Sequence, residues 1–317
     1  MRTRSVIFQG VLAAIALAAA CFVSLREPEG APGEVVVLDA PVSALERVRH
    51  EDASGGVELY REPSEDGALW LRLGTRELRA NADAVRLFSR FAPLRASRSL
   101  GVLDAEHLAE VGLKDSARVL RVFLSQGEQA FRLAAPASGW RGPYLWRESD
   151  GQVFLLSASL LPDLENAAHR LVDRSLHAFG AGEYDTLSLT MPDGASRAFR
   201  VQTHADRPAS LVPLDAPGAP DEAARRWHER ITLLAPAAGD FLGRGEAPPG
   251  GPPHESFRVE YGRGGTHLGH LTVARGADGV FYVRTEHTPG WARLAPWAGS
   301  LVEEARRVVL TPTGTRP

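Results

Sequence analysis

Two histidines that follow a glycine-rich segment, residues 262–265, come closest to a metal site in this chain. His267 and His270 lie on what the pattern predicts as the second strand of a hairpin. Side chains three positions apart on a strand point to opposite faces, so both imidazoles cannot bind one ion without a bulge between them. The pairs His228-Glu229 and His254-Glu255 lack the second histidine of a zinc-protease helix. We therefore predict no metal site and no cofactor.

Nucleophilic and phosphate chemistry have equally little support in the sequence. The single lysine, Lys114, lies in Gly-Leu-Lys-Asp, which is not a Walker-type phosphate loop, and no Gly-x-Ser-x-Gly elbow is present. The carboxylate pairs Glu303-Glu304 and Asp221-Glu222 fall where helix ends or surfaces are predicted, and spacing alone does not make them acid and base. No catalytic residue is predicted.

One positively charged segment is a candidate contact surface. Residues 72–98 hold seven arginines against two acidic residues, a net charge of +5. Arg86 and Arg90 are four apart and share a face of a predicted helix, and Arg95 and Arg98 follow closely. We predict that these four arginines contact anionic lipid headgroups or an acidic partner subunit. The alternative is an ordinary solvated helix face in an arginine-rich chain.

Composition limits the classes of partner and the redox chemistry. The net charge of −3 gives no reason to expect nucleic acid, so none is predicted. Cys21 is the only cysteine and lies inside an apolar run, so the remaining chain has no disulfide and must be stabilised by a hydrophobic core.

The apolar run from Val6 to Leu25 follows Arg2 and Arg4 and predicts a membrane anchor. A helix of that length covers about 30 Å, the hydrocarbon thickness of a bilayer. The prediction is a single-pass protein of the cell membrane, with residues 1–5 as a cytoplasmic tail and the body from Arg26 extracytoplasmic, in the periplasm.

A cleavable signal peptide is the alternative for the same segment. Residues 18–20 are three alanines in front of Cys21, which resembles a processing site and also permits lipidation of Cys21 as a minor alternative. Phe22 and Val23 prolong the apolar run past that site and favour the uncleaved anchor. Both interpretations place the body on the same side of the membrane.

The elements that would position any site form two predicted units of similar order. The predicted fold class is α+β: a transmembrane helix and then two tandem repeats, each a small, mainly antiparallel sheet with packed helices. A shift of about 137 residues superimposes the predicted strands and the closing helices, 159–176 and 290–306. The predicted boundaries are a linker at 26–56, repeats at 57–179 and 183–310, and a tail at 311–317.

The first repeat resembles an uncharacterised family called domain of unknown function 4340. The residues that carry the resemblance are Leu108-Ala109-Glu110-Val111-Gly112-Leu113, then Tyr144 and the strand 153–157. The family usually has a proline soon after the Gly-Leu pair, where this chain has Ser116-Ala117. The resemblance implies an N-terminal anchor, an extracytoplasmic body and association with ABC-type transporters of the gliding-motility auxiliary kind. It implies no catalytic residues.

These observations predict a non-catalytic, membrane-anchored interaction subunit, an accessory of an ABC-type transporter, rather than an enzyme. The first alternative is an envelope-polymer hydrolase whose acids converge from distant positions. The second is a small-ligand receptor that uses the groove between the repeats. A cleft lined by convergent polar groups would favour the receptor or the enzyme, and a flat arginine-bearing or apolar surface would favour the interaction subunit.

Overall fold

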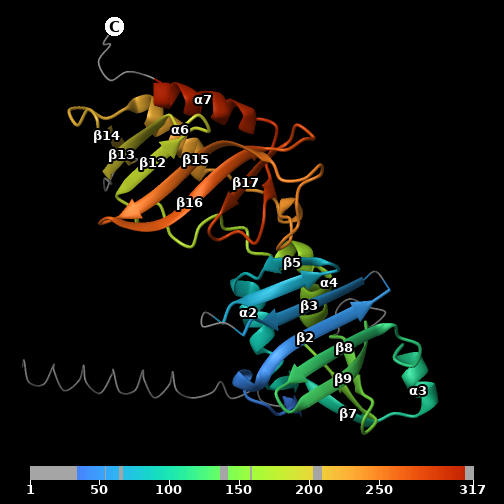
Figure 1. Ribbon diagram of the computed structural model, residues 1–317. Helices are drawn as coiled ribbons and strands as arrows, with labels where there is room; N and C mark the ends of the chain where they lie inside the picture. The colour runs from blue at the N-terminus through green and yellow to red at the C-terminus, as the bar shows by residue number, and fades with distance from the viewer. Residues whose placement is uncertain are drawn as a thin grey trace, which may run out of the picture.

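Two large antiparallel sheets dominate the computed structural model, which describes residues 34–310 except 54, 64–66, 136–141, 158 and 203–208 (Figure 1). One sheet has nine strands and one has seven, and a two-stranded sheet, β1-β6, accompanies the first. Helices are short, the longest being α7 (Ala298–Leu310). The predicted α+β class is therefore wrong, because the described chain is mostly β-structure.

The first unit is built on the nine-stranded sheet, with the order β5-β4-β3-β2-β8-β9-β10-β11-β7. Val48, Leu59 and Val122 lie side by side in register on its buried face, while Arg47 and Arg49 alternate with them on the other face. The strands of this unit, with those of the small sheet, are β1 (Val35–Leu38), β2 (Leu45–Asp52), β3 (Gly55–Arg61), β4 (Leu69–Leu73), β5 (Arg76–Arg79), β6 (Leu94–Ala96), β7 (Arg98–Val102), β8 (Arg118–Leu124), β9 (Gly127–Ala134), β10 (Tyr144–Arg147) and β11 (Gln152–Leu155). Strands β1 and β2 and the start of β3 thus lie within residues 26–56, the predicted linker.

Helix α2 (Ala82–Ser89) covers the buried face of this sheet. Asn81 is its N-cap, and the side chain accepts a hydrogen bond from the Ala84 N–H at 3.0 Å. Leu87 and Phe88 are buried against the sheet, whereas Val85 is 51% exposed. The buried face of α2 therefore consists of Ala84, Leu87 and Phe88.

The predicted closing helix of the first unit, residues 159–176, is two short helices, α4 (Leu160–Glu165) and α5 (Ala167–Arg170). The chain turns at Asn166, which lies between them with a non-helical φ/ψ. Val172 then pairs with Ala80 beside β5, so this stretch returns to the sheet and leaves the helical path. A further helix, α3 (Ala105–Glu110), packs with Leu113, Ala134 and Val153 near the far edge of the sheet.

The second unit is built on the seven-stranded sheet, with the order β14-β13-β12-β15-β16-β17-β18. Helices α6 (Glu222–Thr232) and α7 cover one face, where the Trp227 ring meets Phe257 edge-on at 5.7 Å and its Nε1–H donates to the Leu301 carbonyl at 3.1 Å. The strands are β12 (Thr186–Thr190), β13 (Ser196–Gln202), β14 (Ser210–Pro213), β15 (His254–Arg263), β16 (Thr266–Arg275), β17 (Phe281–Thr285) and β18 (Ala292–Arg293). Two single turns of 3-10 helix, at Val42–Ala44 and Ala238–Asp240, complete the described elements.

The predicted membrane anchor is not supported. None of the helices within the described part of the chain is long and apolar enough to cross a membrane. The apolar run from Val6 to Leu25 and the candidate lipidation site Cys21 lie outside the described residues. The predicted single-pass topology and the cell-membrane, periplasmic localisation depended on the anchor, so they are not supported either.

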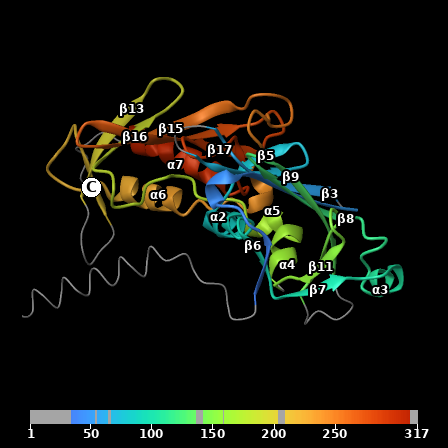
Figure 2. The same ribbon diagram turned by 90° about the horizontal axis from the view of Figure 1, so that it is seen from below.

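A short segment, Phe241–Arg244, joins the two sheets through its backbone. The Leu242 N–H donates to the Trp291 carbonyl at 2.8 Å, and the Arg244 N–H donates to the Glu77 carbonyl of β5 at 2.9 Å. The Arg244 guanidinium lies 3.6 Å from the centre of the Trp70 ring and pairs with Glu62 at 2.8 Å. Figure 2 shows helices α2, α4, α5, α6 and α7 on one side of the sheets, so the uncovered faces of both sheets lie on the other side.

Substitution at Gly243 tests this joint. A Cβ atom there would lie 2.9 Å from the Glu77 nitrogen, closer than backbone atoms tolerate. We expect Gly243→Ala to lower the free energy of unfolding by about 1–3 kcal/mol, the usual cost of overpacking. Urea unfolding measures the change. Gly239→Ala, where a Cβ would meet nothing within 4 Å, is the control and should change stability by less than about 0.5 kcal/mol. Equal effects of the two substitutions would show that the close approach of Gly243 to β5 does not contribute to stability.

His228 makes stability depend on pH. Its side chain is buried in α6 with Nε2 3.3 Å from the Tyr184 hydroxyl, and burial lowers its pKa to about 4. The unfolded imidazole takes up a proton near pH 6.5, whereas the folded one resists it until about pH 4. The free energy of unfolding should therefore fall as the pH drops through this window, by up to about 3 kcal/mol.

Urea unfolding at several pH values checks this expectation. His228→Phe should reduce the pH dependence in this window, because the variant lacks this buried imidazole, while the lowered pKa of the buried His50 leaves part of the dependence in place. His254→Phe replaces an exposed histidine at the start of β15 and should leave the dependence unchanged. A wild-type protein equally stable at both ends of the window would contradict the assignment.

Candidate functional site

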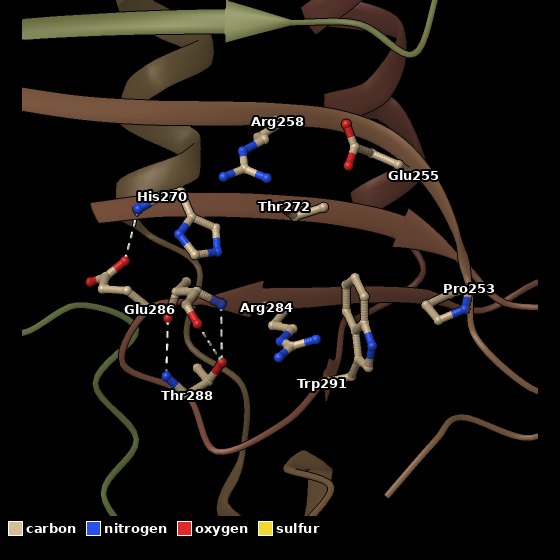
Figure 3. A pocket seen from close by; sticks show the side chains of 10 residues that line it. Pro253, Glu255, Arg258, His270, Thr272, Arg284, Glu286, Thr288 and Trp291 are labelled. Carbon is tan, nitrogen blue, oxygen red and sulfur yellow. Dashed lines mark hydrogen bonds between the residues drawn. The ribbon is translucent and has the colours of Figure 1, made fainter. Parts of the chain in front are cut away.

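The uncovered face of the seven-stranded sheet carries a pocket with a volume of about 390 Å³ (Figure 3). It lies over β15, β16 and β17, and the chain after β17 forms one wall. Its lining is mainly polar and combines cations, carboxylates, an imidazole, hydroxyls and one indole: Arg258, Arg284, Glu255, Glu286, His270, Thr272 and Trp291.

Three of these residues form one cross-strand row. Arg258 on β15 lies opposite Thr272 on β16, and Thr272 lies opposite Arg284 on β17. Neighbouring strands are about 4.8 Å apart, so the two arginine backbones are separated by about 10 Å, a gap that their long side chains can close. Figure 3 shows the two arginines on either side of β16, with His270 and Glu286 at one end of the pocket and Glu255 at the other.

The two arginines differ in their partners. Arg258 Nε lies 3.2 Å from a carboxylate oxygen of Glu260, and both side chains are partly exposed. Arg284 is exposed and has no ion-pair partner among the described residues; its guanidinium lies 6.0 Å from the centre of the Trp291 ring. The pocket thus offers a guanidinium whose donors are available for a carboxylate or phosphate.

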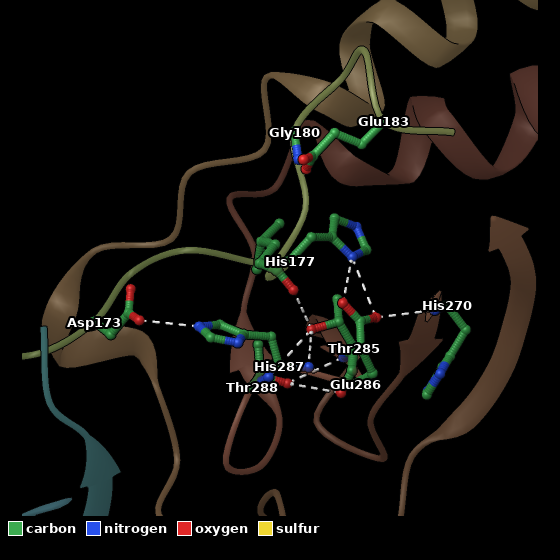
Figure 4. A network of polar contacts seen from close by, with 10 residues as sticks. Asp173, His177, Gly180, Glu183, His270, Thr285, Glu286, His287 and Thr288 are labelled. Carbon is green, nitrogen blue, oxygen red and sulfur yellow. Dashed lines mark hydrogen bonds and ion pairs between the residues drawn. The ribbon is translucent and has the colours of Figure 1, made fainter. Parts of the chain in front are cut away.

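Glu286 forms one wall of the pocket. This wall is the one nearest residues 171–185, which form the linker between the two units. One of its carboxylate oxygens accepts from the His270 backbone N–H at 2.9 Å, and the other lies 2.9 Å from His177 Nδ1 (Figure 4). Because an ionised carboxylate only accepts, Nδ1 of His177 carries the hydrogen. The close approach requires a glycine at position 269, where a Cβ would lie 2.4 Å from the Glu286 carboxylate carbon.

These contacts hold Glu286 ionised. Burial raises the pKa of its carboxyl group, but the hydrogen bond and charge of His177, with the His270 N–H, outweigh burial and lower the pKa below its usual value. The pKa of the His270 imidazole is also lowered, by burial first and by the nearby Arg258 second, and this favours its neutral form. At neutral pH His270 therefore offers one donor and one acceptor to a ligand.

The linker segment before β12 is fixed against the end of β17. His177 packs its ring on Phe179 at 4.6 Å, and the Thr285 hydroxyl donates to the Leu176 carbonyl. His287 Nε2 lies 2.9 Å from an Asp173 carboxylate oxygen, as Figure 4 shows. Asp173 is itself bound to the first unit, since its N–H donates to the Arg79 carbonyl at 2.8 Å. The pocket wall and the joint between the units therefore share one polar network.

The predicted contact arginines lie elsewhere. Arg86 on α2 pairs with Asp83, and Arg90, which follows that helix, donates to the Ser159 hydroxyl at 3.2 Å. Arg95 lies in β6 and Arg98 begins β7, so the four are spread over several elements, and none lines the pocket. Their role as a contact surface stays a prediction.

The two histidines first considered for metal binding belong to different hollows. His270 lines the pocket described above, whereas His267 lines a second hollow toward β12. His270 pairs with Glu260 and His267 pairs with Gly262, and a register shift in the β15-β16 pair lies between these two positions. No cluster of three or more His, Cys, Asp or Glu that suits a metal ion occurs among the residues that the structure describes.

Sequence reasoning missed the pocket residues Arg258, Thr272, Arg284 and Trp291. The signal was present, because polar residues alternate with Phe257, Val259, Leu271 and Val273 along the predicted strands. Such alternation predicts a strand with one buried face and one solvent-exposed face. It does not predict which strands are neighbours, and the row across β15, β16 and β17 depends on that.

The chain matches no known family model, no curated protein and no solved structure. The resemblance of the first repeat to domain of unknown function 4340 therefore stays a prediction.

Neutralising Glu286 tests the network. Glu286→Gln keeps the shape but removes the charge that His177 binds, so we expect a loss of about 1–3 kcal/mol of stability at neutral pH. The pKa of Glu286 is lowered by folding, so its contribution is present above the unfolded pKa and is lost as the pH falls through the folded value. Variant and wild type should therefore converge in urea unfolding at acidic pH, once the pH lies below the lowered pKa of folded Glu286.

Glu255→Gln is the matched control, because Glu255 is an exposed carboxylate at the other end of the same pocket. It should change stability by less than about 0.5 kcal/mol. A difference between Glu286→Gln and wild type that stays constant down to that acidic pH would show that the charge is not responsible.

Proposed function

We propose that this chain is a non-catalytic binding protein whose ligand carries a carboxylate or phosphate group and binds in the pocket on the uncovered face of the seven-stranded sheet. The observation that carries the proposal is the row of Arg258, Thr272 and Arg284, in which Arg284 has no ion-pair partner among the described residues. An anionic group over Thr272 would lie between the two guanidiniums and could accept a hydrogen bond from the threonine hydroxyl.

The groups around this row would orient the rest of the ligand. His270 offers a donor and an acceptor, Glu255 offers acceptors at one end of the pocket, and Trp291 offers part of the face of its indole ring. The pocket therefore suits a polar ligand that combines one anionic group with hydroxyl or amine donors. It lacks the largely apolar lining that is typical of sites for hydrophobic small molecules.

The state of the carboxylates supports binding over hydrolysis. A glycosidase-type mechanism needs one carboxylic acid with a raised pKa, but the pKa of Glu286 is lowered and its oxygens are already occupied by His177 and the His270 N–H. The hydroxyl groups of Thr285 and Thr288 are engaged in hydrogen bonds with the surrounding chain, so neither is poised as a nucleophile.

The proposal keeps the non-catalytic role predicted from the sequence and moves the site. A pocket of convergent polar groups was the feature expected of a receptor or an enzyme, and it lies on one sheet rather than in a groove between repeats. The predicted association with a transporter rests on the family resemblance alone and stays a prediction.

Replacing Arg284 tests the proposal. We expect inorganic phosphate and galacturonate to bind wild-type protein with dissociation constants of about 1 mM or lower in amide NMR titrations. Arg284→Gln should weaken both by about tenfold or more, because it removes the available guanidinium. Arg263→Gln, in the β15-β16 hairpin and outside the pocket, is the control.

The arginine control should bind like wild type. Two results would contradict the proposal: no binding of either anion, or an equal loss of affinity in both variants. Urea unfolding of each variant shows whether a loss of binding reflects a loss of folded protein.

A further inference from the structure

A second hollow of about 260 Å³ lies on the same sheet face beside the pocket, over β12 and β15. Its polar groups are hydroxyls, one carboxylate and one imidazole, from Thr186, Ser188, Thr266, Glu260 and His267. Unlike the pocket, it contains no arginine. The two hollows therefore offer different chemistry to one ligand.

Strand register connects the two hollows. Ser188 on β12 lies opposite Glu260 on β15, and Glu260 lies opposite His270 on β16. The next row on the same face runs from Thr190 to Arg258, Thr272 and Arg284. From β12 to β17 these rows cross three strand spacings, about 14 Å. One row is thus hydroxyl, carboxylate and imidazole, and the adjacent row is hydroxyl and guanidinium.

A ligand that fills both hollows must be long, and it must present hydrogen-bonding groups to their polar residues and apolar surface to Ala198 and Leu214 of the second hollow. An extended peptide recognised through its backbone would need a free strand edge, but β12, β15 and β16 each have a neighbour on both sides. A densely charged polymer such as a nucleic acid would meet three carboxylates on this surface, Glu255, Glu260 and Glu286. A ligand with few negative charges and many hydroxyl groups therefore suits this surface better than a nucleic acid does.

We infer that the ligand is an acidic oligosaccharide, whose carboxylated sugar lies between Arg258 and Arg284 and whose neighbouring sugars lie along Ser188 and Glu260 into the second hollow. The inference rests on the proposed function, since it names the ligand class of the same pocket. The carboxylate of the sugar would pair with the guanidiniums. Ring hydroxyls would donate to Glu260 and accept from Ser188, and the second hollow would contribute affinity only to chains longer than one sugar.

Titration with sugars of defined length tests the inference. We would measure binding of the monomers galacturonate and glucuronate, of trisaccharides (acidic trimers) that join one of these acidic sugars to two neutral sugars, and of neutral maltotriose, by calorimetry and amide NMR. At least one acidic trimer should bind about tenfold or more tighter than its own monomer, and maltotriose should bind more weakly than that trimer.

Variants in the second hollow separate this inference from the proposed function. Ser188→Val and the exposed-site variant His267→Ala should remove the advantage of the trimer and leave monomer affinity unchanged. Arg284→Gln should weaken monomer and trimer alike. Acidic trimers that bind no tighter than their monomers would overturn the oligosaccharide inference and leave the anion pocket standing. If no acidic monomer, no trimer and no phosphate binds, the proposed function fails with it.

Discussion

The architecture depends on one backbone connection, in which the segment Phe241–Arg244 donates hydrogen bonds to Trp291 of the second unit and to Glu77 of the first. Backbone donors at such a buried joint must find acceptors, so the position of one sheet edge fixes the other. Gly243 allows the close approach. The helices gather on one side of both sheets, and the pocket opens on the side that they leave uncovered.

Charge is distributed differently on the two uncovered sheet faces. In the first unit, Arg72 binds Glu58 and Glu77 and lies over the Tyr60 ring, so its guanidinium is already engaged. In the second unit, Arg284 contacts only an indole among the described groups. The joint also contributes to the pocket, because His177 of the linker holds Glu286 ionised and in place. The binding function that we propose depends on this engaged carboxylate beside an available guanidinium.

The sequence predicted local features well where one residue type decides them. Asparagine is a favoured N-cap residue and Asn81 caps α2, and the strands around Val259 and Leu271 follow from alternation. The sequence did not predict features that depend on contacts between distant segments. The predicted helix 159–176 is interrupted at Asn166, because Val172 pairs with Ala80 of the first sheet. The arginine row was hidden for the same reason, since its members come together only through strand order.

The most direct test of the central claim is an NMR spectrum of the arginine Nε–H groups during titration with phosphate and then galacturonate. The account predicts that the signals of Arg284 and Arg258 move with a common saturation curve, because both guanidiniums contact the same anion. The signals of Arg86 and Arg90, on the helix-covered side, should stay in place. Movement of Arg86 and Arg90 without Arg284 would contradict the account and would locate the contact surface on α2 instead.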